Sequence, residues 1–391
     1  MSSNHFLDLA CKVLHKGRLA FPENVPFTMQ IERQGTGGSV EIWFRTQGCR
    51  HSHAGGCTMC NYWTSAPATV DQMITSVQAA LNTVEFHPDL LMVNPFGSMF
   101  DEWEVPPRAR RAIFELLSRV PPTSIAFETR ADTISDDKVS ECTRILRRHY
   151  VAIELGVESS DPWISRYCVN KALSIQDIRA AVIMVRRAGL FPIANILIGT
   201  PFLTFHEMVD DAISSLNWAF AQGFERCVVF PVCIKPSTLV ARLEEMGLYT
   251  QPSLWALVDV LSGLHPVMLP RTEVVWYKPP VLIHPDCQIP SRSPVTCPKC
   301  YGIVVSLFDA YRRSHDRRGL IEQLNSLKCR CRDAWYRQVA VEPTSPLGQR
   351  VKATYQVIGQ ELLDPGWWLQ NGEAVLASIP DHDLRTVTEG N

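Results

Sequence analysis

The sequence predicts an α/β fold built on a mainly parallel sheet, followed by a helical, cysteine-bearing extension. Between residues 40 and 235, short apolar runs alternate with amphipathic helical patterns. The runs are nearly continuous in apolar residues, as is typical of parallel strands buried on both faces. Beyond residue 235 this regularity ends. Six alternating β/α units indicate a parallel sheet that is either open or curved toward a barrel.

The predicted elements follow one another in a regular order. The expected strands cover residues 40–46, 90–96, 124–130, 150–158, 191–199 and 226–234. The expected helices cover residues 69–85, 106–119, 136–148, 174–188 and 205–222. Ser135 and Ser174 mark two helix starts, because a serine side chain can cap the first turn, and Gly189 marks a helix end.

The chain divides into three parts on this pattern. We expect a helical lead-in over residues 1–38, the β/α core over 39–235 and the C-terminal extension over 236–391. Residues 270–300 of the extension are rich in Pro and Cys and show little periodicity, and further helical patterns follow them.

Charge and hydropathy exclude several classes of protein. The 38 Lys and Arg against 40 Asp and Glu give a net charge of −2, which provides no overall attraction to nucleic acid or to an anionic membrane. No stretch approaches the ~18 apolar residues of a membrane span, and the first residues lack the apolar centre of a signal peptide. We therefore expect a cytoplasmic protein with no membrane partner, in which thiols stay reduced.

The clearest motif follows the first expected strand, where Cys49, Cys57 and Cys60 lie in a glycine-containing loop. The carboxyl ends of parallel strands are where α/β folds place their active sites. A structural zinc would take these three thiolates with His51 or His53 as the fourth ligand. An Fe–S cluster held by three cysteines would leave one iron open to an outside ligand, and the position at the mouth of the sheet favours this interpretation.

These features resemble the radical S-adenosylmethionine (SAM) superfamily, whose core is a partial (β/α)6 barrel. The spacing C-x7-C-x2-C is similar to the longer loops of Elongator-catalytic-subunit-like members. Five segments together resemble the radical-SAM partner subunit of archaeosine synthase. They are FRTQGCRHSHAGGCTMCNYW, NPFGSMFDEWEVP, FETRADTISDD, ELGVESSDPWISRYCVNKALSIQDIRAAV and LIGTPFLTFHEMVDDAI.

The resemblance implies that the three cysteines hold a 4Fe-4S cluster whose open iron binds SAM. An electron donor of flavodoxin or ferredoxin type would drive cleavage of SAM to a 5′-deoxyadenosyl radical that abstracts hydrogen from the substrate. Tyr62 would lie against adenine, Glu158 would bind the ribose, and Arg130 would bind the carboxylate. All residues with an implied SAM contact are Tyr62, Asn94, Gly97, Ser98, Glu128, Arg130, Glu158, Ser159 and Gly199. For a charged residue at a strand end, an internal ion pair is the alternative.

A second group of five cysteines lies in the extension, and a C-x2-C pair followed by C-x-C is metal-ligand spacing. The preferred ligands are Cys297, Cys300, Cys329 and Cys331, with Cys287 as a substitute. A structural zinc, an auxiliary Fe–S cluster and unligated cysteines remain alternatives, because zinc and iron both accept four thiolates. Four other cysteines are interpreted as packing residues, namely Cys142, Cys168, Cys227 and Cys233.

We expect a radical SAM enzyme that acts on a small, nucleoside-like molecule in specialised metabolism, by C–H functionalisation, rearrangement or sulfur insertion. No catalytic acid–base pair is expected. A tRNA-modifying enzyme of archaeosine-synthase type is one alternative, which the near-neutral charge disfavours, because the Arg clusters at 108–111 and 312–318 lie on expected helices. A zinc-stabilised RNA-binding module without redox chemistry is the alternative from another class.

Overall fold

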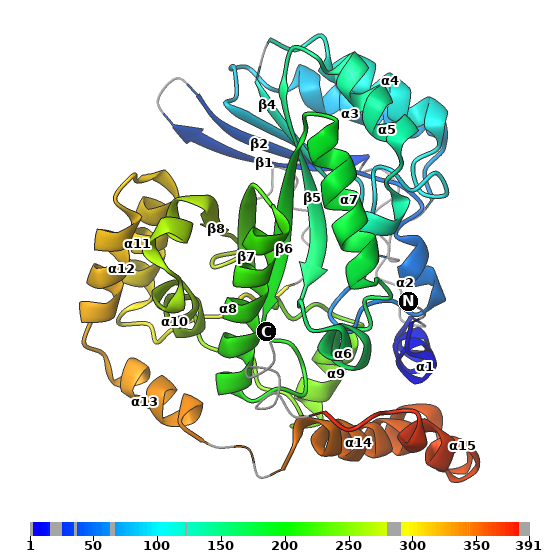
Figure 1. Cartoon of the computed structure of the whole chain (residues 1–391), viewed down its shortest axis with the longest axis vertical. Helices are drawn as coiled ribbons and strands as arrows, with labels where there is room; N and C mark the ends of the chain where they lie inside the picture. Colours follow the sequence, from blue (N-terminus) through cyan, green and yellow to red (C-terminus); the bar gives the residue numbers. More distant parts are fainter. Residues whose placement is uncertain are drawn as a thin grey trace.

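A computed structural model describes residues 3–15, 26–34, 37–62, 67–121, 123–279, 291–341, 343 and 345–382. Its centre is an eight-stranded sheet in which the strands lie in chain order. They are β1 (Phe27–Gln34), β2 (Gly37–Phe44), β3 (Leu90–Asn94), β4 (Ser124–Thr129), β5 (Tyr150–Glu158), β6 (Phe191–Ile198), β7 (Arg226–Pro231) and β8 (Thr272–Val274). The first pair is antiparallel and every later pair is parallel. The sheet curls into a half-barrel, which confirms the predicted partial barrel (Figure 1).

Helices between the strands cover the outer side of the sheet (Figure 1). They are α3 (Val70–Asn82), α4 (Pro107–Leu117), α5 (Asp136–Ile145), α7 (Ile175–Arg187) and α8 (Phe205–Gln222), with the short α2 (Arg50–Ala54) and α6 (Pro162–Ile164) in loops. Both serines predicted to start helices, Ser135 and Ser174, are N-caps, and Ser174 forms a reciprocal capping box with Asp177. In α7 the residues buried against the sheet recur every three or four positions, which is the amphipathic pattern read from the sequence.

Strand alternation gives the curled sheet a mixed inner face. In β5, Val151, Ile153, Leu155 and Val157 are almost fully buried in the hydrophobic core. The intervening residues, among them Glu154 and Glu158, line a cavity on the inner face. Successive side chains of a strand point to opposite faces, so one apolar-looking run supplies both the core and a polar interior.

The lead-in and the edges of the sheet differ from the sequence expectation. The lead-in does contain a helix, α1 (His5–Leu14), but Phe27–Gln34 forms β1 and pairs with β2 as an antiparallel edge. Its alternation of apolar and polar residues is that of a half-buried strand. At the other edge, β8 has three residues and pairs with β7. It is too short to produce a periodic signal in the sequence.

The extension is helical and returns to the start of the chain. Its helices are α9 (Leu239–Glu245), α10 (Trp255–Gly263), α11 (Tyr301–Arg313), α12 (Arg317–Ser326), α13 (Arg330–Val339), α14 (Leu347–Ile358) and α15 (Pro365–Ala377). Tyr355 of α14 stacks on Phe6 of α1 with ring centroids 4.6 Å apart. Its hydroxyl donates a 2.7 Å hydrogen bond to the carbonyl of Tyr167, so α14 joins α1 to the core.

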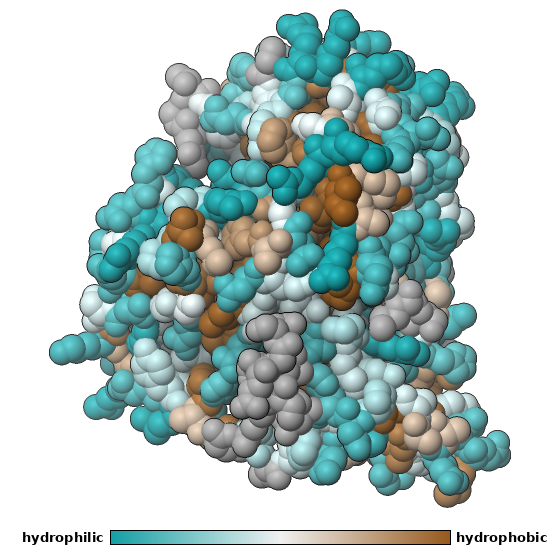
Figure 2. Space-filling model, viewed as in Figure 1, coloured by the Kyte–Doolittle hydropathy of each residue, from teal (hydrophilic) through white to brown (hydrophobic). Residues whose placement is uncertain are grey.

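The surface in this view is mostly hydrophilic, and hydrophobic residues gather mainly over the sheet and helices in its middle (Figure 2). Within the described ranges, no helix combines the length and the apolar character that a membrane crossing requires.

Candidate active site

A cavity of about 1000 Å³ fills the inside of the curled sheet. It extends from the three-cysteine loop, beyond the carboxyl ends of the strands, to residues near their amino ends such as Tyr150 and Arg226. Its volume is at the upper end of the range of ligand pockets, so it can hold a cofactor together with a small substrate. We call it the chamber.

The loop that carries Cys49, Cys57 and Cys60 lies at one end of the chamber, and all three cysteines line it. Backbone hydrogen bonds within the loop and to a distant segment fix it. The backbone N–H of Cys49 donates to the carbonyl of Tyr62 at 3.3 Å, and that of Thr58 donates to the carbonyl of Val169 at 3.0 Å. The sequence therefore folds here into a loop held at both ends, with its thiols directed at one space.

The loop offers a single metal ion fewer thiols than the second cysteine group does. Among the described residues, the side chains whose metal-binding atoms all lie within 4.8 Å of one another are four cysteines of the extension. Both histidines proposed as a fourth zinc ligand bond to backbone carbonyls through Nε2, His51 to Asn170 at 2.6 Å and His53 to Gln47 at 2.7 Å, which leaves only Nδ1 of each ring for a metal.

Burial and nearby cations shape the electrostatics of the loop. Burial raises the pKa of the Cys49, Cys57 and Cys60 thiols to about 11 each. Nearby cations oppose this rise in pKa. Arg130 acts on Cys49 and Cys57, Lys171 acts on Cys57, and Lys235 acts on Cys60. Free thiols here are protonated at neutral pH, and a bound metal would hold them as thiolates. Three cysteines facing one space, with cations to offset the charge, fit an Fe–S cluster.

Five of the nine predicted SAM contacts lie on the chamber wall, namely Tyr62, Gly97, Glu128, Arg130 and Glu158. Glu158 Oε1 accepts a 2.7 Å hydrogen bond from Lys171 Nζ, and Glu158 Oε2 is buried without a hydrogen-bond partner among the described residues. Lys235 Nζ lies 4.7 Å from the centroid of the Tyr62 ring. Glu158 thus forms the internal ion pair that was the alternative to SAM binding, and its second carboxylate oxygen remains available to a ligand.

The other four predicted contacts are buried beside the chamber and bond to the protein. Asn94 Oδ1 accepts from the backbone N–H of Glu128 at 2.8 Å, and Ser98 Oγ shares a 2.7 Å hydrogen bond with Thr129. Ser159 Oγ donates to Asp211 at 2.7 Å, and the carbonyl of Gly199 accepts from the Tyr249 hydroxyl at 2.8 Å. Their roles toward SAM stay predictions.

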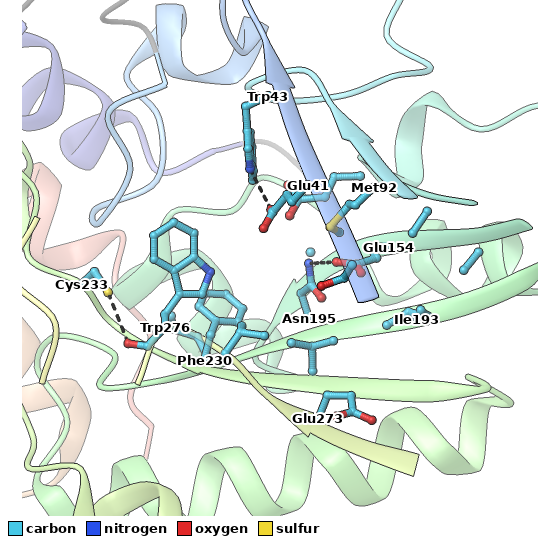
Figure 3. Close-up of a pocket in the computed structure, with 18 of the residues that line it drawn as sticks. Glu41, Trp43, Met92, Glu154, Ile193, Asn195, Phe230, Cys233, Glu273 and Trp276 are labelled. Atoms are coloured by element: carbon cyan, nitrogen blue, oxygen red, sulfur yellow. Dashed lines mark hydrogen bonds between the residues drawn. The ribbon is translucent and has the colours of Figure 1, made fainter. Parts of the chain in front are cut away.

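Beyond the loop, the inner part of the chamber carries a group of polar and aromatic side chains to which the sequence interpretation assigned no role (Figure 3). Glu41, Glu154 and Asn195 approach one another from β2, β5 and β6, and Trp43 and Trp276 lie on the side toward the loop. Asn195 Nδ2 donates to Glu154 Oε2 at 3.1 Å, whereas Asn195 Oδ1 is buried without a partner among the described residues.

These inner carboxyl groups share an unfavourable environment for charge. Burial raises the pKa of Glu154 to about 7, and it also raises the pKa of Glu41 and of Glu128. Glu154 adds to the shift of Glu128 because the two residues pair in register on β4 and β5. The sequence signal for this group is that glutamates alternate with apolar residues along these strands. A bound cation or N–H donor would stabilise their ionised forms.

The second cysteine group comes together as predicted. Sγ atoms lie 3.6 Å apart for Cys297 and Cys300, and 3.4 Å apart for Cys297 and Cys329. Cys331 Sγ lies 3.4 Å from Cys300 and also from Cys329. Hydrogen bonding from Cys329 lowers the pKa of Cys297 to about 6. Cys287, the proposed substitute, lies outside the described residues.

The remaining cysteines match their interpretation as packing residues. Cys142, Cys168 and Cys227 are fully buried, and Cys233 is 7% exposed.

Comparisons with known proteins found related sequences and similar solved structures. No protein-family model matches the chain. Archaeosine synthase subunit beta of Methanosarcina acetivorans is 26% identical over 313 residues, which cover 78% of this chain and 86% of that protein. The protein of the same name from Thermococcus kodakarensis is 26% identical over 314 residues, 76% of this chain and 91% of its own length. The solved archaeal Elp3 of Methanocaldococcus infernus superposes with a TM-score of 0.44 at 14% identity, over 64% of this chain and 59% of that one.

The curled sheet and the three-cysteine loop define a chain that resembles the radical SAM enzymes, as the sequence motifs predicted. The two relatives confirm the resemblance to archaeosine synthase subunit beta that the sequence segments indicated.

Proposed function

We propose that this chain is a radical SAM enzyme whose 4Fe-4S cluster is held by Cys49, Cys57 and Cys60 at one end of the chamber. The observation that carries the proposal is that three half-buried cysteines line the same chamber as Tyr62 and Glu158. When bound, the cluster and SAM would supply a 5′-deoxyadenosyl radical that removes a hydrogen atom from the substrate. The chain would position the substrate and exclude water.

Individual residues of the wall support this proposal by their chemistry. The unpartnered Oε2 of Glu158 can accept hydrogen bonds from ribose hydroxyls, because Lys171 occupies only the other oxygen. Arg130 forms the internal ion pair expected as the alternative, with two 3.0 Å bonds to Asp132, so only its Nη1 side remains for the SAM carboxylate. The aromatic ring of Tyr62 gives adenine a surface on which to stack.

The inner part of the chamber supports a substrate class. Glu41, Glu128 and Glu154 present acceptors from β2, β4 and β5, and Asn195 adds an amide oxygen without a partner among the described residues. When a bound cation or N–H group keeps these carboxyl groups ionised, they attract that group and repel phosphate. We therefore infer that the substrate inserts an N–H-rich or cationic end, such as a nucleobase edge or an amine, and keeps any phosphate outside.

Two further observations bear on whether the substrate is a small molecule or tRNA. The relatives named archaeosine synthase subunit beta favour a tRNA nucleoside as substrate, and their being subunits favours a protein partner. The basic clusters argue against a large phosphate-binding surface, because Arg residues of both clusters form ion pairs with Asp or Glu residues of the same chain. The ion pairs are Arg108–Asp71 at 2.8 Å, Arg110–Glu141 at 3.0 Å, Arg312–Glu32 at 3.0 Å and Arg317–Glu273 at 2.6 Å. We favour a small, nucleoside-like substrate, with a tRNA nucleoside as the second candidate.

The test is reductive cleavage of SAM. The protein, purified and reconstituted with iron and sulfide without oxygen, is mixed with SAM and dithionite, and 5′-deoxyadenosine is quantified by chromatography. Release of 5′-deoxyadenosine is expected; an iron-loaded protein that releases none would overturn the proposal. A gel shift with total tRNA at low and high salt tests the second candidate, because phosphate-driven binding weakens steeply with salt.

A further inference from the structure

We infer that Cys297, Cys300, Cys329 and Cys331 hold a single zinc ion in a closed tetrahedral site, and that an auxiliary Fe–S cluster is not bound there. This inference goes beyond the proposed radical chemistry and does not depend on it. It rests on how close together the four sulfur atoms lie, on where they lie relative to the chamber, and on the side chains packed around them.

The sulfur spacing is that of ligands on one metal ion. Four sulfurs at about 2.3 Å from a tetrahedral zinc lie about 3.8 Å from one another. Four of the Sγ–Sγ distances here are 3.4 to 3.6 Å, and all four sulfurs lie within 4.8 Å of one another. In a 4Fe-4S cluster each thiolate binds a different iron, and bridging sulfides hold the irons and thus the thiolates apart. The present arrangement has no room for such a cluster.

The location of the four thiols also argues against a redox or substrate-binding role. An auxiliary cluster that binds substrate must face the substrate. None of these four cysteines is among the described residues that line the chamber, whereas the three cysteines of the first loop all are. A site that supplies four thiolates and lies away from the reaction space matches a structural zinc, which has all its coordination positions filled by protein.

The surroundings form a second shell that orients the ligands. The indole N–H of Trp255 in α10 donates to Cys331 Sγ at 3.2 Å. The guanidinium of Arg332 lies 4.6 Å from the centroid of the Trp255 ring. Trp335 of α13, which is 1% exposed, donates to Asp259 of α10 at 2.6 Å. Hydrogen bonds to ligating atoms and rigid neighbours of this kind fix ligand geometry at metal sites.

The position of the ligands indicates what the ion would do. Cys300 is the N-cap of α11 and Cys329 is the N-cap of α13, so one ion would fasten the starts of two helices to each other and to α10. Helix α10 in turn packs on α8 of the barrel. Zinc would therefore fix the extension onto the barrel, and its removal would loosen the extension while leaving the first cysteine loop in place.

Zinc and iron are measured separately to test this inference. Protein purified without oxygen is analysed by mass spectrometry of the elements, as the wild type and as the variant Cys49→Ala/Cys57→Ala/Cys60→Ala. We expect about one zinc per chain in both proteins. Several irons retained in the triple variant, a single iron in place of zinc, or loss of zinc from the triple variant would each overturn the inference.

Substitution of the ligands themselves completes the test. Cys329→Ser/Cys331→Ser should lose the zinc and unfold at a lower temperature, whereas the matched control Cys142→Ser, in α5, should keep the zinc. Because the double variant can fail to fold, the wild type is also loaded with cobalt(II), which should give the absorption bands of a tetrahedral cobalt–thiolate site. Absence of those bands from cobalt-loaded protein would contradict the inference. The iron content of the first loop is read in the same samples, so failure of the proposed function is seen separately.

Discussion

Lys171 Nζ lies 2.7 Å from Glu158 Oε1, and both residues line the chamber beside the three-cysteine loop. The strand pairing of β5 with β6 shifts between Gly156 and Glu158, and Glu158 has a φ of 64°. A non-glycine residue in this region costs backbone strain, which proteins usually retain at functional sites. The irregular end of β5 thus presents this carboxylate at the chamber.

The first prediction concerns the stability of this ion pair. Lys171→Met should destabilise the protein by about 3–5 kcal/mol, because it leaves a buried carboxylate without its partner. Lys171→Met/Glu158→Gln should recover most of that loss, since no unpaired charge remains. Urea unfolding of the single and double variants measures the difference. A double variant as unstable as the single one would show that Lys171 acts through packing.

The second prediction concerns SAM binding by Glu158. Glu158→Gln should weaken SAM binding by roughly tenfold or more, because hydrogen bonds to a charged acceptor contribute about 1.5–3 kcal/mol. Its iron content should match the wild type, since Glu158 is not a proposed ligand of the cluster. Isothermal titration with SAM on iron-loaded protein measures the affinity. Asp136→Asn, at the exposed start of α5, is the control, and unchanged affinity in Glu158→Gln would remove this residue from the SAM site.

The third prediction concerns Gly97, where backbone packs against the cysteine loop. A Cβ at this position would lie 2.7 Å from Cβ and 2.9 Å from Cα of Cys49. The strand end is also fixed by Glu104, which accepts from the N–H of Ser98 at 2.8 Å. Gly97→Ala should therefore displace the loop, lower the iron content and cost about 1–3 kcal/mol of stability.

A matched glycine in the extension provides the control for Gly97. Gly302→Ala in α11 meets no atom within 4 Å and should keep the wild-type iron content. Equal iron in both variants would mean that the loop tolerates the added methyl group, and that Gly97 does not set the position of Cys49.

The fourth prediction is a pH dependence that originates at Glu154. Burial raises its pKa to about 7, whereas a glutamate in the unfolded chain titrates near 4.3. The unfolded chain therefore releases this proton first as the pH rises, and the folded protein loses stability between about pH 4.5 and 7. Glu154→Gln removes this loss, so its stability relative to the wild type should rise from pH 5 to pH 8 by on the order of 1–3 kcal/mol.

Thermal unfolding at several pH values measures this effect, with the exposed Glu115→Gln of α4 as control. A difference between Glu154→Gln and the wild type that stays constant from pH 5 to pH 8 would show that Glu154 does not titrate in this range.

The sequence predicts the strands β2 to β7 well because each is a continuous apolar run with a turn on either side. It does not predict β1, which lies in the part read as helical, or β8, whose three residues lie in a Pro-rich segment. Periodicity needs several residues to emerge, so short edge strands leave little signal.

Site residues that lie close together in the sequence can be predicted from it, whereas residues that only the fold brings together cannot. Both cysteine groups are visible from spacing alone. The pair Lys171–Glu158 and the approach of Glu41, Glu154 and Asn195 require strands to come together. Glu158 and Ser159 are adjacent, yet only Glu158 lines the chamber, because Ser159 turns to Asp211. A strand end therefore indicates a site without indicating which side chains face it.

Iron content measured together with 5′-deoxyadenosine release shows whether Cys49, Cys57 and Cys60 hold the radical-generating cluster. Wild-type protein and Cys49→Ala/Cys57→Ala/Cys60→Ala are reconstituted side by side without oxygen. We expect about four irons per chain and 5′-deoxyadenosine from the wild type, and neither from the triple variant, which should stay folded. A colourless wild type, or a triple variant that keeps its irons and still cleaves SAM, would contradict this assignment.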